Sequence, residues 1–196
     1  VDVVTLNQTG TYTLLVEGRR NYTTGVNNYR FNVQRVQDDA APAPIGQQMN
    51  GSIAHVGQTD VYTLTLAQHT QVIFDSFTDS SELRWTLAGA AGVIVSDRQL
   101  RSSDSFDGFP LFALAAGTYT LSVSGNGDAT GAYAFRLLDL GTAPVIVPDA
   151  RVAGTLSPGN ETELYRFEGV AGERFFFDGR TATNNDTSWR LLDPYG

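Results

Sequence analysis

An internal repeat is the feature that most constrains what this chain can fold into. Residues 10–18 read GTYTLLVEG and residues 117–125 read GTYTLSVSG, so that seven of nine positions are identical at a separation of 107 residues. Further matches recur at separations of 103 or 104 residues: Tyr29 with Tyr133, Gly51 with Gly154, Tyr62 with Tyr165, Phe74 with Phe177, and Trp85 with Trp189. The repeats of solenoid proteins run about 20 to 50 residues. A period of about 105 residues therefore predicts whole domains in tandem.

The repeat divides the chain into three predicted units. Residues 40–140 form one complete repeat, residues 1–37 are the C-terminal part of the preceding repeat, and residues 143–196 are the N-terminal part of the next. Both junctions are rich in Pro and small residues, as linkers are: 37–44 and 141–148. If each repeat is a β-sandwich domain, half of one would expose an apolar face and unpaired strand edges. We therefore expect residues 1–37 and 150–196 to pair into a second sandwich, either within one chain or head-to-tail between chains.

Alternation of apolar and polar residues indicates the secondary structure. One face of each predicted strand is apolar in three segments: Tyr12, Leu14 and Val16; Tyr62, Leu64 and Leu66; Tyr119, Leu121 and Val123. The continuous apolar runs 72–74 and 175–177 are typical of strands that are buried on both faces. No window has a helix-length amphipathic stripe. The sequence predicts an all-β fold of seven or eight short strands per repeat, most simply an antiparallel two-sheet β-sandwich.

Charge and composition exclude several classes of function. The net charge is −8, the pI is about 4.6, and all 13 basic residues are Arg. Such an acidic chain is a poor partner for nucleic acid or anionic membranes. There is no Cys, and no apolar run approaches the roughly 18 residues of a membrane span. The only imidazoles, His55 and His69, come without a nucleophile elbow or a metal-binding His pair, so we predict that the chain is not an enzyme.

Carboxylates supply the one candidate metal site. Asp75, Asp79 and Glu82 precede Trp85, and Asp178 and Asp186 occupy corresponding positions before Trp189. Ca²⁺ binds several oxygens that converge from loops, so these five residues are candidate calcium ligands, and no other cofactor is predicted. The alternative is that they form turns by bonding to nearby backbone. The spacing favours this alternative, because it does not match an EF-hand loop.

The complete repeat resembles the bacterial pre-peptidase C-terminal domain family. The matching residues occur in the family's order: Gly51-x-Ile53, Asp60-x-Tyr62-x-Leu64, Leu87, the GTYTLSV of 117–123, Tyr133-x-Phe135 and, in the third unit, the Asp-Pro-x-Gly of 193–196. The resemblance implies an exported, jelly-roll-like sandwich. Members are attached to secreted enzymes or built into long surface proteins, and some bind Ca²⁺ or a polymeric substrate.

Two functions remain in view. The favoured one is a non-catalytic structural or adhesive repeat module of an extracellular or cell-surface bacterial protein, with neighbouring repeats as its main partners and an extracellular polymer or protein as a further ligand. The alternative is a carbohydrate- or protein-binding accessory domain of a secreted hydrolase, which an exposed aromatic strip on one sheet would favour. Trp85 and Trp189 could stack on sugars, but their alternation with Leu87 and Leu191 favours a place in the core.

Overall fold

The computed structural model describes residues 3–103, 111–179 and 187–196. Within these residues, the strands of the sheets all lie between Ala40 and Asp139. In chain order they are β1 (Ala40–Pro42), β2 (Gln48–Ile53), β3 (Thr59–Leu66), β4 (Thr70–Ser76), β5 (Leu83–Gly89), β6 (Gly92–Gln99), β7 (Leu111–Leu114), β8 (Gly117–Gly125) and β9 (Gly131–Asp139). Two short 3₁₀ turns, η1 (Leu100–Ser102) and η2 (Leu140–Thr142), follow β6 and β9.

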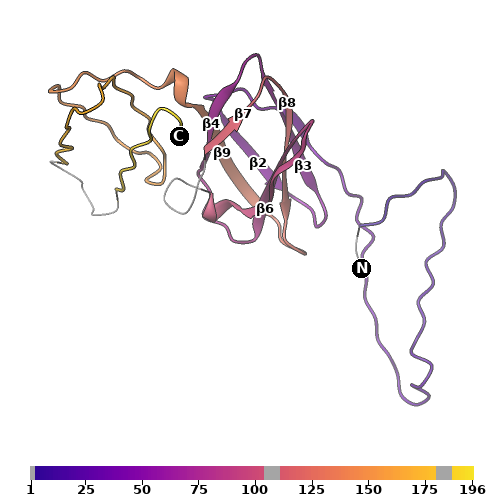
Figure 1. Cartoon of the computed structure of the whole chain (residues 1–196). Coiled ribbons are helices and arrows are strands. Elements are labelled where there is room, and N and C mark those ends of the chain that lie inside the picture. The colour runs from indigo at the N-terminus through magenta and orange to yellow at the C-terminus, as the bar shows by residue number, and fades with distance from the viewer. Residues whose placement is uncertain (1–2, 104–110, 180–186) are drawn as a thin grey trace.

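The strands form two sheets packed face to face (Figure 1). One sheet has the order β1-β3-β8-β5-β6, and the other has the order β2-β9-β4-β7. Every pair of neighbouring strands is antiparallel except β1 and β3, which are parallel. The predicted all-β, two-sheet sandwich is thus confirmed, whereas the tandem arrangement stays a prediction.

The core follows the alternation that the sequence predicts. On β8, Tyr119, Leu121 and Val123 are buried, and the residues between them face outward or lie half-buried. Trp85 is 1% exposed and is therefore a core residue rather than a sugar platform. Its indole Nε1 donates a hydrogen bond to Ser103 Oγ at 2.7 Å, which satisfies its one polar atom inside the core.

Strand β4 is buried on both faces, as its apolar run predicts. Phe74 faces the core between the sheets, and its neighbours Ile73 and Asp75, which by strand geometry point the other way, are 3% and 0% exposed. The cover on this outer face comes from the segment that follows η2, since Asn160 Nδ2 donates to the carbonyl of Ser76 at 3.0 Å. The outer face of β4 is therefore an internal contact of the chain.

The first predicted linker is partly a strand, which corrects the expectation for residues 37–44. Ala40 to Pro42 run beside Val61 to Thr63 as an edge strand, and the amide of Val61 donates to the carbonyl of Asp39 at 2.8 Å. Pro42 fits here because β1 is at the sheet edge, where a missing N–H costs no ladder bond. Composition alone misses this strand because its three residues are small and exposed.

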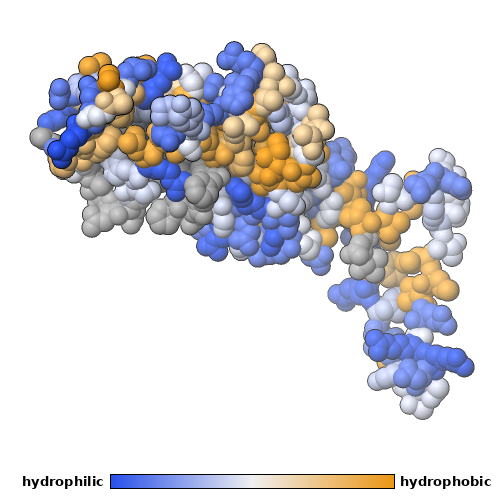
Figure 2. Space-filling view, viewed as in Figure 1, coloured by the Kyte–Doolittle hydropathy of each residue, from blue (hydrophilic) through white to orange (hydrophobic). Residues whose placement is uncertain are grey.

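The two terminal segments, residues 3–37 and the described residues after 142, contain no strand of either sheet. They lie on opposite sides of the sandwich (Figure 1), so the arrangement in this chain does not bring them together. Figure 2 shows apolar side chains at the surface of the N-terminal segment. Tyr12 and Leu14 are 53% and 63% exposed, whereas the matching Tyr119 and Leu121 of β8 are 9% and 0% exposed. The difference arises because β8 has strand neighbours on both sides and residues 10–18 have none.

Candidate functional site

A buried hydrogen-bond network joins the two sheets at the motif residues of β3 and β9. The Tyr133 hydroxyl donates to Asp60 Oδ2 at 2.6 Å and lies 2.9 Å from the Tyr62 hydroxyl. Gln58 Nε2 donates to Asp60 Oδ1 at 2.7 Å, and the other end of its amide accepts the N–H of Ala54 at 2.8 Å. Asp60 is 2% exposed. Both of its carboxylate oxygens are thus satisfied by protein donors.

The chemistry of this network is that of a structural cluster. Burial raises the pKa of Tyr133 above its ordinary value, and the hydrogen bond to Asp60 adds to the rise. Burial also raises the pKa of Tyr62, although the hydrogen bond with Tyr133 opposes it. Both phenols therefore stay protonated at neutral pH and serve as hydrogen-bond donors.

Gly51 is required by the same network. A Cβ at this position would overlap the Tyr133 ring and the Tyr62 hydroxyl, so that only glycine permits the approach of the two rings. Four motif residues therefore lie together in one buried cluster, namely Gly51, Asp60, Tyr62 and Tyr133. Gly154, which matches Gly51 in the repeat, lies in the same way against Tyr165, because a Cβ added to Gly154 would sit 3.2 Å from the Tyr165 hydroxyl oxygen.

A second polar cluster lies on the outer face of β4 and β9. Arg136 donates to Asp75 Oδ2 through Nε at 3.1 Å and through Nη2 at 2.8 Å. The other carboxylate oxygen, Oδ1, accepts the backbone N–H of Thr162 at 3.1 Å. Burial raises the pKa of Asp75, and the hydrogen bonds and charge of Arg136 oppose this rise.

The same Arg136 reaches two residues of the covering segment. Its Nη1 lies 3.1 Å from Glu161 Oε1, and its Nη2 donates to the carbonyl of Thr162 at 3.0 Å. The side chains of Arg136 and Glu161 are 16% and 15% exposed. Arg136 thus holds a carboxylate on each side in a place from which most water is removed.

The five candidate calcium ligands are not gathered into one site by the part of the chain that the structure describes. Asp75 is engaged as above, Asp79 pairs with Arg101 at 3.2 Å, and Glu82 Oε2 accepts from Asn126 Nδ2 at 3.2 Å. Asp178 lies in the C-terminal segment, and Asp186 is outside the described residues. Over residues 3–103, 111–179 and 187–196, no group of three or more His, Asp or Glu side chains is placed to hold a metal ion. Calcium binding stays a prediction from the sequence.

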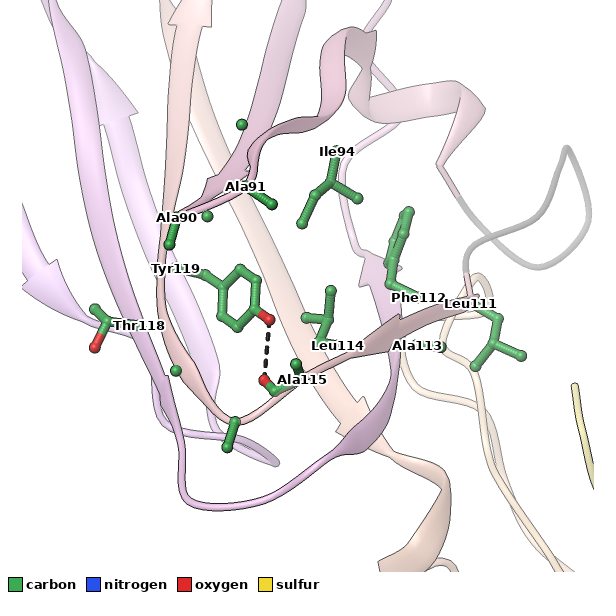
Figure 3. A pocket seen from close by; sticks show the side chains of 14 residues that line it. Ala90, Ala91, Ile94, Leu111, Phe112, Ala113, Leu114, Ala115, Thr118 and Tyr119 are labelled. Carbon is green, nitrogen blue, oxygen red and sulfur yellow. Dashed lines mark hydrogen bonds between the residues drawn. The ribbon is translucent and has the colours of Figure 1, made fainter.

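An apolar cavity of about 510 Å³ opens at one end of the sandwich. It lies between the β5–β6 turn, β7 and the β7–β8 turn, as Figure 3 shows. Ile94, Leu114 and Phe112 project toward it, and the Tyr119 hydroxyl donates to the carbonyl of Ala115 at 2.9 Å beside it. Much of the remaining wall consists of small residues, namely Gly89, Ala90, Ala91, Gly92, Ala113, Ala115, Ala116 and Gly117. Small side chains leave this end of the core unfilled.

The two histidines lie in different turns of the sandwich. His55 is half-buried in the turn between β2 and β3, where its backbone N–H donates to Gln58 Oε1 at 3.3 Å. His69 is exposed in the turn between β3 and β4. Within the described part of the chain, neither imidazole belongs to a cluster of three or more His, Asp or Glu side chains that could hold a metal ion.

Sequence reasoning did not single out Arg136 and Glu161. Arg136 follows Phe135 in a strand whose alternation gives an outward position, where an Arg is ordinary. The one available signal is Asp75, an acidic residue at the end of the apolar run 72–74. A carboxylate on a strand that is buried on both faces requires hydrogen-bond donors or a cationic partner.

Comparisons with known proteins give solved structures only. No protein-family model matches the chain, and no curated protein matches it. The pre-peptidase C-terminal domain of a collagenase from Bacillus anthracis is 16% identical with a TM-score of 0.40, over 54% of this chain and 99% of that one.

Two periplasmic inhibitors of g-type lysozyme, both named PliG, are also similar. The Salmonella Typhimurium protein is 17% identical with a TM-score of 0.40, over 52% of this chain and 98% of its own. The Aeromonas hydrophila protein is 16% identical with a TM-score of 0.39, over 54% of this chain and 99% of its own. The solved structures that are similar to this chain include a pre-peptidase C-terminal domain, the family that the sequence motifs resemble.

Among the described residues, no helix has the length and apolar character needed to cross a membrane.

Proposed function

We propose that this chain is a non-catalytic structural or adhesive module of an extracellular or cell-surface bacterial protein, built from tandem β-sandwich repeats. The observation that carries the proposal is a repeated strand contact. Pro42 pairs with Thr63 in parallel, and Val145 pairs with Arg166 in parallel, with both partners displaced by 103 residues. This displacement equals the separation of Gly51 from Gly154 and of Tyr62 from Tyr165 in the sequence. The start of the third unit therefore repeats the first contact of the complete sandwich.

The surface of the sandwich supports a structural role. Among the described residues between Ala40 and Thr142, every aromatic side chain is buried or half-buried. The exposed large apolar residues of this range are Val56, Val93 and Ile94. A strip of exposed aromatic rings, which a polysaccharide-binding face would need, is therefore not seen in this part of the chain. The extracellular setting follows from the resemblance that the motifs carry.

One observation favours the second candidate, a substrate-binding accessory domain of a secreted hydrolase. The cavity beside Tyr119 has a volume within the range of about 300 to 1,000 Å³ that is common for ligand sites. Its lining of Ile94, Leu114, Phe112 and alanines suits an apolar side chain of a protein substrate better than a sugar.

A binding assay separates the two functions. The full chain is mixed with insoluble polysaccharides and with immobilised unfolded protein, and retention is compared with that of the Ile94→Asp variant, which places a charge at an exposed position of the cavity wall. The proposed structural or adhesive role expects the two proteins to be retained equally, because it does not use the cavity. Retention of the original chain that the variant loses would overturn the proposal and support a substrate-binding module.

A further inference from the structure

The beginning of the third unit covers part of the outer face of β4 and β9, where the Phe77 ring of the sandwich also lies against Arg136. Ile73 and Asp75 project from this face and are 3% and 0% exposed. Three consecutive residues, Asn160, Glu161 and Thr162, contact it. On the same face, Gln71 Nε2 donates to the carbonyl of Tyr195 at 3.1 Å, so the third unit touches β4 at two separate places.

Each of the three residues makes a different kind of polar contact. Asn160 Nδ2 donates to the carbonyl of Ser76 at 3.0 Å. Glu161 Oε1 lies 3.1 Å from Arg136 Nη1. The backbone of Thr162 donates to Asp75 and accepts from Arg136, at 3.1 and 3.0 Å. All of these groups have to be in place at once, which is a strong geometric restriction on the covering segment.

Burial makes this contact selective. Arg136 and Glu161 are 16% and 15% exposed, and Asp75 is fully buried. If the covering segment moved away, the Asp75 and Arg136 side chains would regain water on one face but lose the amide and carboxylate that match them. A segment with other side chains would leave polar groups buried without partners, which is the more costly state.

The repeat gives an internal comparison. Positions 160–162 of the third unit match positions 57–59 of the second, where the residues are Gly57, Gln58 and Thr59. Position 136 matches Asn32 of the first unit. The side chain of Gln58 is buried and bonded to Ala54 and Asp60 inside its own unit, so it does not serve as a partner of Asn32. The ion pair of Arg136 and Glu161 is therefore particular to this junction.

We propose that the outer face of β4 and β9 is a docking surface for the first turn of the following repeat, and that the ion pair of Arg136 and Glu161 holds the two repeats at a fixed orientation. This inference rests on the proposed function, because it takes residues 143–196 as the start of a repeat. Under this proposal, consecutive repeats are held at a fixed orientation to each other and are not joined by a flexible linker.

The test measures the orientation of the third unit in the full chain. Because the chain has no Cys, two spin labels can be placed cleanly at Thr65→Cys on β3 and Val170→Cys in the third unit, both exposed positions. Pulsed electron paramagnetic resonance then gives the distribution of distances between the two labels. Hydrogen exchange measures the protection of the Thr162 amide. The docked state predicts a narrow distribution and a protected amide.

Variants outside the sandwich test the contact without endangering its fold. Glu161→Arg should broaden the distribution and abolish protection of the Thr162 amide. Glu163→Arg is the matched control, because Glu163 is exposed and two residues away, and it should change neither measurement. The double variant Asn160→Gly and Glu161→Gln, which copies the second unit, should also broaden the distribution.

The outcomes are decisive in each direction. A Glu161→Arg protein with an unchanged distribution, or a Glu163→Arg protein that is equally disturbed, overturns the docking surface. A double variant Asn160→Gly and Glu161→Gln that docks as well as the original chain overturns the role of the Arg136–Glu161 ion pair. Binding to polysaccharide or unfolded protein that depends on the cavity would overturn the proposed function while leaving these results intact, so the two failures are distinguishable.

Discussion

Phe74 and Trp85 stack face to face between the two sheets, with ring centroids 3.9 Å apart and planes inclined by 8°. Phe74 belongs to β4 and Trp85 to β5, so the pair joins one sheet to the other at the centre of the core. Phe135 of β9 also stacks on Phe74, at 5.2 Å. These three rings fill the space between the sheets without leaving a polar atom unpaired, because the indole N–H reaches Ser103.

Replacing Trp85 with Ala should destabilise the sandwich strongly. The change removes a fully buried ring and leaves a cavity, which costs about 3 to 5 kcal/mol for a large aromatic residue. Urea unfolding followed by far-ultraviolet circular dichroism measures the loss. Val93→Ala on β6 is the control, since Val93 is 63% exposed, and it should change stability by less than about 0.5 kcal/mol. Equal effects of the two substitutions would contradict the assignment of Trp85 to the core.

Gly51→Ala should destabilise the sandwich by about 1 to 3 kcal/mol, because the added methyl group overlaps Tyr133 and Tyr62. Gly10→Ala is a matched control, since nothing lies within 4 Å of a Cβ at that position. Thermal unfolding of both variants provides the comparison. A fully stable Gly51→Ala protein would show that the two tyrosine rings do not need this close approach.

Tyr133→Phe should cost about 1 to 3 kcal/mol, the range for leaving a buried acceptor unsatisfied. The substitution keeps the ring, which packs against Phe135, but removes the donor to Asp60. Asp60 keeps its hydrogen bond from Gln58, so the loss should stay within this range. Urea unfolding at pH 7 measures it, and an unchanged midpoint would contradict the network.

Alkaline pH should destabilise the chain through the same tyrosines. The pKa values of Tyr62 and Tyr133 are raised in the folded state, so their contribution is complete below the ordinary pKa of about 10. Above that pH the unfolded chain releases protons that the folded chain retains, so the free energy of unfolding should fall as the pH rises, by up to about 1.4 kcal/mol per pH unit for Tyr133. Denaturant titrations from about pH 9 to about pH 11.5 follow this slope. Tyr133→Phe should make it shallower, whereas Tyr22→Phe, at an exposed site, should not.

The calcium hypothesis has its own test. It requires the thermal midpoint to rise when Ca²⁺ replaces a chelator, and the rise to vanish in the double variant Asp79→Asn and Glu82→Gln. The free energy gained would grow with the logarithm of the Ca²⁺ concentration, as for any ligand of the folded state. Identical midpoints with chelator and with Ca²⁺ would contradict the hypothesis.

Local patterns in the sequence predict the strands and the core well. Period-two alternation places Tyr119, Leu121 and Val123 on a buried face, and the same rule puts Trp85 in the core. This succeeds because the side-chain period of a strand is fixed by backbone geometry. The sheet order and the parallel β1–β3 pair lie outside such rules, since they depend on contacts between distant parts of the chain.

Sequence patterns do not predict the polar clusters, because these clusters also depend on contacts between distant parts of the chain. Asp75 and Arg136 are 61 residues apart, and the residue that completes the cluster, Glu161, lies in the segment after η2. No spacing rule links three such positions. Asp75 was grouped with Asp79 and Glu82 by proximity in sequence, but the pleat of β4 turns its carboxylate to the outer face, where Arg136 lies.

The β1–β3 pair has a mechanical consequence. A force that pulls on the N-terminal side of the sandwich reaches β1 first, and β1 is bonded along its length to β3 rather than suspended in a loop. The amide of Ala43, just beyond β1, adds a further bond to the carbonyl of Thr63 at 2.9 Å. Since a load applied along a strand strains its ladder bonds together, whereas a load across it opens them singly, this short edge strand would serve as the point at which tension enters the fold.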